Sequence, residues 1–428
     1  MISRSTDPAI GNGAGVNQNR LYLHRDVRLV LLDYGRYQFL RATAAALRAN
    51  GVDILYVYNS AISSANQGSG KDSGVESGEV GIGVRKQIEK YSPVRRWIQE
   101  REWSRNCIRF LETARPTILF SANAPLDVQR RLAAWCRGNG VLFVFWVQDI
   151  LGLAIRTLFG HRWPFIGNLI GRYYERVEAK LLRQSDHVIL ISEDHSRLID
   201  MYNMDRSRVS LMPNWAVVED FPEFPKDNDW SREHSLSKTF NFVYSGTLGM
   251  KHSPNLLLKL AHQFSGTENV RVIVISEGLG ADWLLSQRER LGLQNLIILP
   301  FQPSACVPLS LGAADVLLTL LDRTASEFCV PSKVLTYLCI GRPLLMAIPD
   351  ENRAARLVSE LKAGIVVSPE SDQDLFAAAL RLFSCPSERT AMGKRARNYA
   401  EREFRSENVC RGFTAIVHTV LEGAERRA

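Results

Sequence analysis

VRLVLLDYGRYQFLRATAAALRANGVDILYVY, residues 27–58, is the stretch that decides the fold of this chain. An apolar run at 27–32 predicts a buried strand, the pattern at 37–49 predicts a helix, and a second apolar run at 52–58 predicts another strand. Strand, helix and strand in such quick succession are typical of a parallel βαβ unit, because parallel neighbours need a crossover connection.

The same alternation continues on both sides of a change in composition. Residues 213–231 hold three prolines and several turn formers, so we expect the connection between two domains there. The near-continuous Val/Ile/Leu strands suit sheets that are covered on both faces. We therefore predict an α/β protein with two Rossmann-like, doubly wound domains that face a central cleft. The further strands are expected at 117–121, 141–147, 187–191, 240–245, 270–276, 296–299, 316–320, 344–347 and 365–367.

The expected domain boundaries follow from composition. Residues 1–24 are polar and predict a disordered tail, and 25–220 form the first domain, with a Ser/Gly-rich flexible loop at 59–83. A linker at 221–237 leads to the second domain at 238–403. A C-terminal helix is expected at 404–428, and its return to the first domain is left open.

Composition excludes several classes of protein. With 46% hydrophobic and 23% charged residues, the 428-residue chain is neither disordered nor collagen-like. The longest apolar run, 141–147, is too short to span a bilayer, and the first residues lack the apolar core of a signal peptide or anchor. We expect a cytoplasmic protein, at most peripheral at the inner face of the plasma membrane.

The seven cysteines are odd in number, widely scattered and without a C-x-x-C pair. They predict reduced thiols rather than a disulfide framework or a structural zinc site.

The charge is unevenly distributed. Residues 1–225 hold 29 basic and 23 acidic side chains, against 24 and 22 in the remainder. Residues 85–109 combine eight basic and three acidic residues with Trp97 and Trp103. Residues 151–182 add apolar side chains among four arginines, namely Leu158, Phe159, Trp163, Phe165 and Ile166 among Arg156, Arg162, Arg172 and Arg176. This mixture suits an anionic membrane surface; a solvated basic surface with ordinary core aromatics is the alternative. No nucleic-acid-binding module is visible, so we expect no nucleic-acid partner.

The first candidate site is YSGTLGMK, residues 244–251. Gly246 and Gly249 let the backbone approach a ligand, and Lys251 supplies a point charge for phosphate. An ordinary tight turn between strand and helix is the alternative interpretation.

The second candidate site begins FCVPSKVLTYL, residues 328–338. Pro331 suits a first helical turn, Ser332 or its predecessor is expected to cap the helix, and Lys333 adds a cation at the positive helix end. A helix start of this kind at the carboxyl edge of a sheet is where α/β domains hold phosphates. A well-capped core helix is the alternative.

The third candidate is Asp149, at the end of the apolar strand that leads into WVQD, residues 146–149. Its carboxylate can orient an acceptor hydroxyl or take its proton. A simple turn or N-cap role is the alternative.

Together, YSGTLG, PSKVLTYLCIGRPLL, WVQD and VILISE…LMPNW resemble family 4 glycosyltransferases. The closest likeness is to the branch of bacterial exopolysaccharide, colanic-acid-type and O-antigen assembly. The resemblance implies the GT-B architecture, with a nucleotide-diphosphate sugar bound mainly by the second domain and a glycan or polyprenyl-linked acceptor by the first. It also implies retention of anomeric configuration without a bound metal or another cofactor.

The resemblance assigns roles to individual residues. Gly246, Thr247 and Lys251 match the phosphate-binding loop, while Asp149 matches the acceptor-side aspartate. The helix start that faces the donor sugar and diphosphate corresponds to Cys329, Val330, Pro331, Ser332 and Lys333. The nucleoside side corresponds to Glu277, Gly278, Phe301, Gln302 and Thr336, with Thr336 at the expected ribose position.

Three residues depart from the family pattern. Thr247 replaces a common Arg, Gln148 a common His and Thr336 a common Glu; Glu327 lies one place off the first Glu position. We expect a retaining transferase in which Lys251, Lys333 and helix amides stabilise the departing diphosphate. An inactive nucleotide-sugar-binding scaffold protein is the alternative. An epimerase or phosphorylase is disfavoured, since neither paired carboxylates nor a lysine for pyridoxal is apparent.

Overall fold

The computed structural model describes residues 27–62, 78–86, 88, 92–152, 155–156, 164–249, 252–323 and 331–427. The tail expected at 1–24 lies outside these residues. So do three residues of the predicted site, Lys251, Cys329 and Val330.

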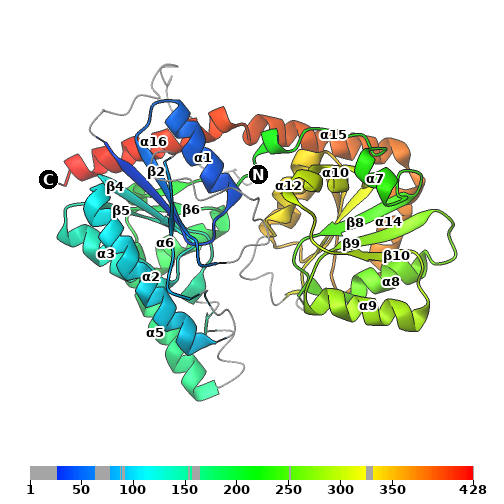
Figure 1. The fold of residues 1–428 in the computed structure, drawn as a ribbon, viewed down its shortest axis with the longest axis horizontal. Helices are drawn as coiled ribbons and strands as arrows, with labels where there is room; N and C mark the ends of the chain where they lie inside the picture. Colours follow the sequence, from blue (N-terminus) through cyan, green and yellow to red (C-terminus); the bar gives the residue numbers. More distant parts are fainter. Residues whose placement is uncertain are drawn as a thin grey trace, which may run out of the picture.

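The first domain is a parallel sheet of seven strands in the order β3-β2-β1-β4-β5-β6-β7 (Figure 1). The strand order reverses between β1 and β4, which pair in parallel, and such a reversal is where doubly wound domains bind ligands. Every residue of β1 is buried, as expected for a sheet covered on both faces. The strands are β1 Leu29–Asp33, β2 Ile54–Asn59, β3 Glu79–Ile82, β4 Ile118–Ala122, β5 Leu142–Val147, β6 His187–Leu190 and β7 Val209–Leu211; the longer helices are α1 Gln38–Ala49, α2 Pro93–Ala114, α3 Leu126–Gly138 and α5 Pro164–Gln184, followed by the short α6 Arg197–Met201.

Strand β3 corrects the prediction of one flexible loop at 59–83. Residues 79–82 pair with β2 at the sheet edge. The Arg41 guanidinium donates to both carboxylate oxygens of Glu79 at 2.9 Å, and the Trp103 indole donates to the carbonyl of Ile82 at 2.9 Å. These anchors come from helices distant in the sequence, so the local Gly-rich composition does not indicate them. Residues 63–77 of the predicted loop lie outside the described part of the chain.

The segment between the domains is more structured than the linker predicted at 221–237. Helix α7, Asp229–Glu233, begins with a capping box between Asn228 and Ser231. Its Trp230 is buried and donates from the indole to Gln302 of the second domain at 2.8 Å. The linker thus packs onto the second domain as part of its surface.

The second domain is a parallel sheet of six strands in the order β10-β9-β8-β11-β12-β13. Its central pair, β8 and β11, again marks the reversal of strand order. The strands are β8 Phe240–Ser245, β9 Val270–Ile275, β10 Leu296–Leu299, β11 Val316–Leu320, β12 Leu344–Ala347 and β13 Gly364–Val367; the helices are α8 Asn255–Gln263, α9 Leu279–Leu291, α10 Val307–Gly312, α12 Lys333–Ile340, α13 Arg353–Glu360, α14 Asp372–Ser384, α15 Pro386–Glu403 and α16 Ser406–Glu425.

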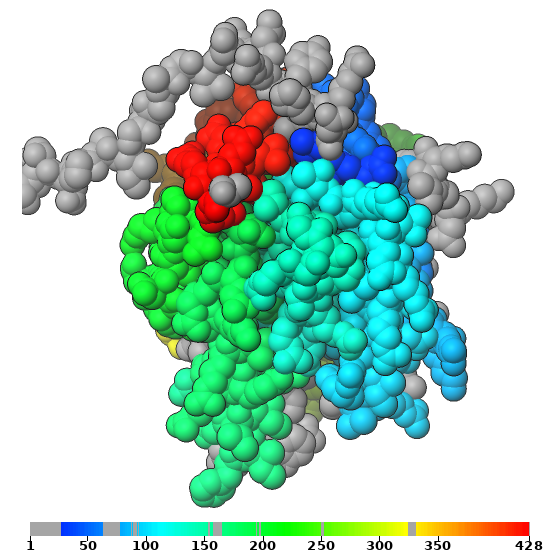
Figure 2. Space-filling view, turned by 90° about the vertical axis from the view of Figure 1, so that its left-hand side faces the viewer, coloured from blue at the N-terminus to red at the C-terminus, as the bar shows by residue number. Residues whose placement is uncertain are grey.

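The last two helices run across both domains (Figure 1). Helix α15 packs on α12, whereas α16 packs on α1 of the first domain. The ring of Phe413 on α16 lies 4.7 Å from that of Phe120 and 6.2 Å from that of Trp146, centroid to centroid. Figure 2 looks onto the first domain and shows the end of α16, in red, between segments coloured blue to cyan and green. The C-terminal helix is therefore part of the first domain's packing.

Within the described residues, none of the helices has both the length and the apolar content that crossing a bilayer requires.

Candidate functional site

The turn after β8 brings two predicted site residues together. Gly246 has φ +125°, a conformation that side-chain-bearing residues rarely adopt, and its amide donates to the carbonyl of Ile275 at 3.0 Å. A Cβ atom at this position would lie 3.2 Å from the Nζ atom of Lys333. Gly246 is thus required both by its backbone angle and by the closeness of the lysine. The neighbouring Thr247 is exposed.

Helix α12 is fixed to the end of β8 through one face. Lys333 and Tyr337 are four residues apart and so lie on the same side of the helix. The Tyr337 hydroxyl accepts from the amide of Ser245 at 2.9 Å and donates to its carbonyl at 3.1 Å. The Nζ atom of Lys333 lies 3.5 Å from the centroid of the Tyr244 ring. The cation of this helix start is therefore held directly above the Gly246 turn.

The start of α12 differs from the prediction in one respect. Ser332 has helical φ and ψ of −59° and −26° and makes no side-chain capping hydrogen bond, because an N-cap residue needs an extended backbone to accept from its helix. The amides of Val334 and Leu335 donate to the carbonyls of Pro331 and Ser332, both at 3.1 Å. Pro331 is buried and Ser332 is exposed, so the Ser332 hydroxyl lies on the surface of the helix start.

The predicted nucleoside residues form a second cluster, at the ends of β9 and β10. The Glu277 carboxylate accepts from the amide of Phe301 at 3.1 Å, and Gly278, with φ +97°, is the N-cap residue that precedes α9. The side chain of Gln302 accepts from the Trp230 indole at 2.8 Å and donates to the carbonyl of Pro300 at 2.9 Å, so it is held against the protein. Thr336 lies partly exposed on α12, three residues after Lys333.

Asp149 lies apart from these residues, in the first domain. It follows β5 and is exposed. The preceding Gln148 accepts, through its carbonyl oxygen, from the side-chain amide of Asn214 at 2.7 Å. Asn214 follows β7, so this bond joins two strand ends at the carboxyl edge of the sheet. Gln148 therefore serves to fix the turn that carries Asp149.

Two buried carboxylates hold loops at this edge. Glu178 on α5 accepts from the amide of Gly152 at 3.2 Å, and burial raises its pKa to about 7. Asp33, at the end of β1, accepts from the hydroxyl of Tyr56 and the amide of Gly35, each at 2.9 Å. Burial raises the pKa of Asp33 to about 6, although these hydrogen bonds oppose the rise.

Sequence reasoning missed the supporting residues of the site: Tyr244, Tyr337, Asn214, Glu178 and Asp33. The positions of the two tyrosines in the sequence could have indicated their role. Tyr244 directly precedes the Ser-Gly turn, and Tyr337 stands four residues after Lys333. The carboxylates gave no signal, because an acidic residue after a strand is common in turns.

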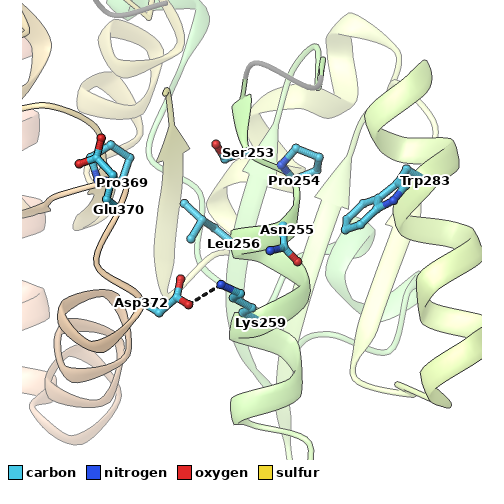
Figure 3. A pocket seen from close by; sticks show the side chains of 9 residues that line it. All are labelled: Ser253, Pro254, Asn255, Leu256, Lys259, Trp283, Pro369, Glu370 and Asp372. Carbon is cyan, nitrogen blue, oxygen red and sulfur yellow. Dashed lines mark hydrogen bonds and ion pairs between the residues drawn. The ribbon is translucent and has the colours of Figure 1, made fainter. Parts of the chain in front are cut away.

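The cavity drawn in Figure 3 lies at the start of α8 and has a volume of about 430 Å³. None of the predicted site residues that the structure describes lines it. Its floor carries an ion pair between Lys259 of α8 and Asp372 of α14. The cavity is thus separate from the cluster around Gly246 and Lys333.

The basic face of the first domain is only partly as predicted. Trp103 is buried in the core rather than exposed, since its indole is needed at the carbonyl of Ile82. Residues Leu158, Phe159 and Trp163 lie outside the described part of the chain. Exposed apolar side chains do occur on α2 and on the N-terminal half of α5, which projects from the domain (Figures 1 and 2). They are Val94, Trp97, Ile98, Phe165, Ile166, Leu169 and Tyr173.

Comparison with known proteins agrees with this architecture. The family model described as a glycosyl transferase 4-like domain matches residues 27–215, and that described as glycosyl transferases group 1 matches residues 226–399. An Escherichia coli (strain K12) protein named as a colanic acid biosynthesis glycosyl transferase, WcaI, is 24% identical over 251 residues. That alignment covers 58% of this chain and 60% of the relative.

Solved structures share the fold at low sequence identity. Anabaena Alr3699/HepE in complex with UDP-glucose superposes with a TM-score of 0.66 at 13% identity, over 92% of this chain and 99% of that one. WaaG, a glycosyltransferase involved in lipopolysaccharide biosynthesis, gives 0.65 at 12% identity, over 91% and 99%. With two family models in succession across both domains, the chain belongs to the family 4 glycosyltransferases and has the GT-B fold.

Proposed function

We propose that this protein transfers a sugar, with retention of anomeric configuration, from a nucleotide-diphosphate sugar to a glycan or polyprenyl-linked acceptor of cell-surface polysaccharide biosynthesis. The observation that carries the proposal is the position of the Lys333 ammonium, at the start of α12 and against the Gly246 turn. The complexes of similar structures with UDP and UDP-glucose favour UDP over GDP as the nucleotide.

The proposed chemistry follows from where charge develops. When the bond from the anomeric carbon to the diphosphate oxygen breaks, its electron pair stays on the diphosphate, which gains negative charge. Lys333, together with Lys251 of the same predicted site, stabilises that charge more in the transition state than in the bound donor. These cations take the place of a metal ion in the proposal.

The acceptor is assigned to the first domain. Its hydroxyl oxygen forms the new bond to the anomeric carbon and gives up its proton. Asp149, on the exposed turn after β5, is proposed to orient that hydroxyl and to receive the proton. The hydrogen bond from the Asn214 side-chain amide to the Gln148 carbonyl oxygen keeps this turn in place.

We also propose that the protein docks on an anionic membrane surface at the inner face of the plasma membrane, where a lipid-linked acceptor would be reached. Phe165 is 92% exposed and Leu169 is 70% exposed on the projecting half of α5, and exposed Arg172 and Arg176 follow them on the same helix. Apolar side chains next to arginines match the interface between acyl chains and anionic headgroups.

The central experiment is a donor panel. Purified protein is incubated with UDP- and GDP-sugars and with a membrane lipid extract as acceptor, and nucleotide release and product formation are measured. One donor should be consumed, with its anomeric configuration kept in the product. Lys333→Ala should lower turnover at least about tenfold without loss of fold, since one cation at the diphosphate is removed. Binding of a nucleotide sugar without any transfer or hydrolysis would instead identify the scaffold role.

A further inference from the structure

Tyr244 connects two parts of the predicted donor site, the Lys333 ammonium and the turn after β8, although it is itself buried. Its ring lies under the Lys333 ammonium, with 3.5 Å between Nζ and the ring centroid. Its hydroxyl donates to the carbonyl of Thr247 at 2.8 Å. The side chain is fully buried, and the residue lies near the end of strand β8, two positions before Gly246. One residue therefore contacts both the cation and the turn that carries the predicted phosphate loop.

We propose that Tyr244 is the positioning residue of Lys333: its electron-rich ring face holds the ammonium in the place where the departing diphosphate needs it. This inference rests on the proposed transferase function. An aromatic face attracts a cation through its quadrupole, and the attraction grows where water is excluded. A lysine side chain is long and flexible. When its ammonium is already held in place, the side chain does not have to reorganise during the chemical step.

The surroundings restrict the lysine from the other sides. Gly246 has no side chain, so the Lys333 ammonium can lie close above the turn; a Cβ atom at this position would already lie 3.2 Å from Nζ. The Tyr337 hydroxyl bonds both the amide and the carbonyl of Ser245, so the helix that carries Lys333 cannot slide along β8 without breaking two hydrogen bonds. The ring of Tyr244 lies directly against the ammonium itself.

The test is a double-mutant cycle measured by kcat and by KM for the donor. Tyr244→Phe keeps the ring and loses only the bond to Thr247, so kcat should stay within about twofold of the unaltered protein. Tyr244→Leu loses the ring face, and kcat should fall about tenfold with little change in KM, the scale of a buried cation–π contact. In a Lys333→Ala background, Tyr244→Leu should cause less than about a twofold further loss, since the group it positions is gone.

A second comparison keeps the test valid even if Tyr244→Leu fails to fold. Tyr244→Phe is compared with a protein that carries trifluorophenylalanine at the same position: the two rings have nearly the same shape, but fluorine weakens the negative charge of the ring face. The kcat should fall on fluorination when Lys333 is present and stay unchanged in Lys333→Ala. Losses that add fully in the double mutant, or no effect of fluorination, would overturn the proposal. Full turnover of Lys333→Ala alone would instead remove Lys333 from the donor site and contradict the proposed function.

Discussion

The Nε2 atom of His187 lies 2.8 Å from the Oγ atom of Ser210, where β6 pairs with β7. Burial lowers the pKa of His187 to about 4, and repulsion from Arg427 and Arg208 contributes in the same direction. The folded protein therefore keeps this imidazole neutral at pH values where an unfolded chain would protonate it.

His187 should make the protein less stable in mild acid. Between its ordinary pKa of 6.5 and the folded value of about 4, the unfolded chain binds a proton at His187 that the folded chain does not bind. The free energy of unfolding therefore decreases as the pH is lowered through this range. We expect a loss of about 2 kcal/mol from this group between pH 7 and pH 4.5. Urea unfolding at a series of pH values measures it, and His187→Gln should lack that part of the slope. Identical slopes for the two proteins would contradict the assignment.

Glu178 should act in the opposite direction. Burial raises its folded pKa from the ordinary 4.5 to about 7, so the free energy of unfolding falls as the pH rises from about 4.5 to about 7 and stays low above that. Glu178→Gln keeps an oxygen for the Gly152 amide and removes the charge. The variant should be more stable than the unaltered protein at pH 8, and the difference should disappear at pH 4, below both pKa values. Thermal unfolding at both pH values checks this, and a stabilisation that does not depend on pH would count against it.

Gly393 should tolerate no side chain. A Cβ atom there would lie 2.2 Å from the carbonyl oxygen of Gly341, where α15 meets the end of α12. Gly393→Ala should lower the free energy of unfolding by at least about 2 kcal/mol, because two backbones must separate. Gly412→Ala is the matched control: it lies within α16 with nothing within 4 Å of its Cβ position, and should stabilise by about 0.5–1 kcal/mol. Equal effects in urea unfolding would refute the packing argument.

Turnover should not require a divalent cation. If Lys333 and Lys251 stabilise the departing diphosphate, an excess of EDTA should leave the rate of nucleotide release unchanged. Assays with EDTA and with added Mg²⁺ compare the two conditions directly. Activity that disappears with the chelator and returns with Mg²⁺ would assign that task to a metal.

Vesicle binding should depend on both components of the basic face. Phe165→Ser with Leu169→Ser removes exposed apolar surface and should weaken binding to anionic vesicles at every salt concentration. Arg95→Gln with Arg96→Gln removes charge and should weaken it mainly at low salt. Leu279→Ser, at the 78% exposed start of α9 in the second domain, is the control and should bind normally. Cosedimentation measures all three, and equal losses would show that the surface is not specific.

Much of the fold could be predicted because long apolar runs encode its central strands. Strands β1 and β5 are such runs, β8 and β9 are mainly apolar, and the helices between successive strands indicate parallel order. The edge strand β3 could not be found in this way. It is short, contains a glycine, and depends on ion pairs from α1 to Glu79. For Trp103 the sequence left a surface position and a core position open, and the buried indole matches the core alternative; a helix pattern does not show which of its sides meets a neighbouring strand.

The candidate site could be predicted in part for a similar reason. Gly246 and Lys333 stand in recognisable local patterns, and the fold brings them together. The contact of Lys333 with Tyr244 joins residues 89 positions apart, so no local pattern contains it. Ser332 or its predecessor was expected to cap α12, and Ser332 does not, because the backbone already has helical angles at that residue.

The path of α16 has a practical consequence for engineering. Because this helix leaves the second domain and covers Phe120 and Trp146 of the first, the two domains are not separable by a single cut in the sequence. A chimera that takes the first domain of a relative must also take the segment from Ser406 onward, and a second domain produced alone should end near Phe404. Removing the last twenty or so residues from the intact enzyme would expose the rings of Phe120 and Trp146 to solvent and promote aggregation.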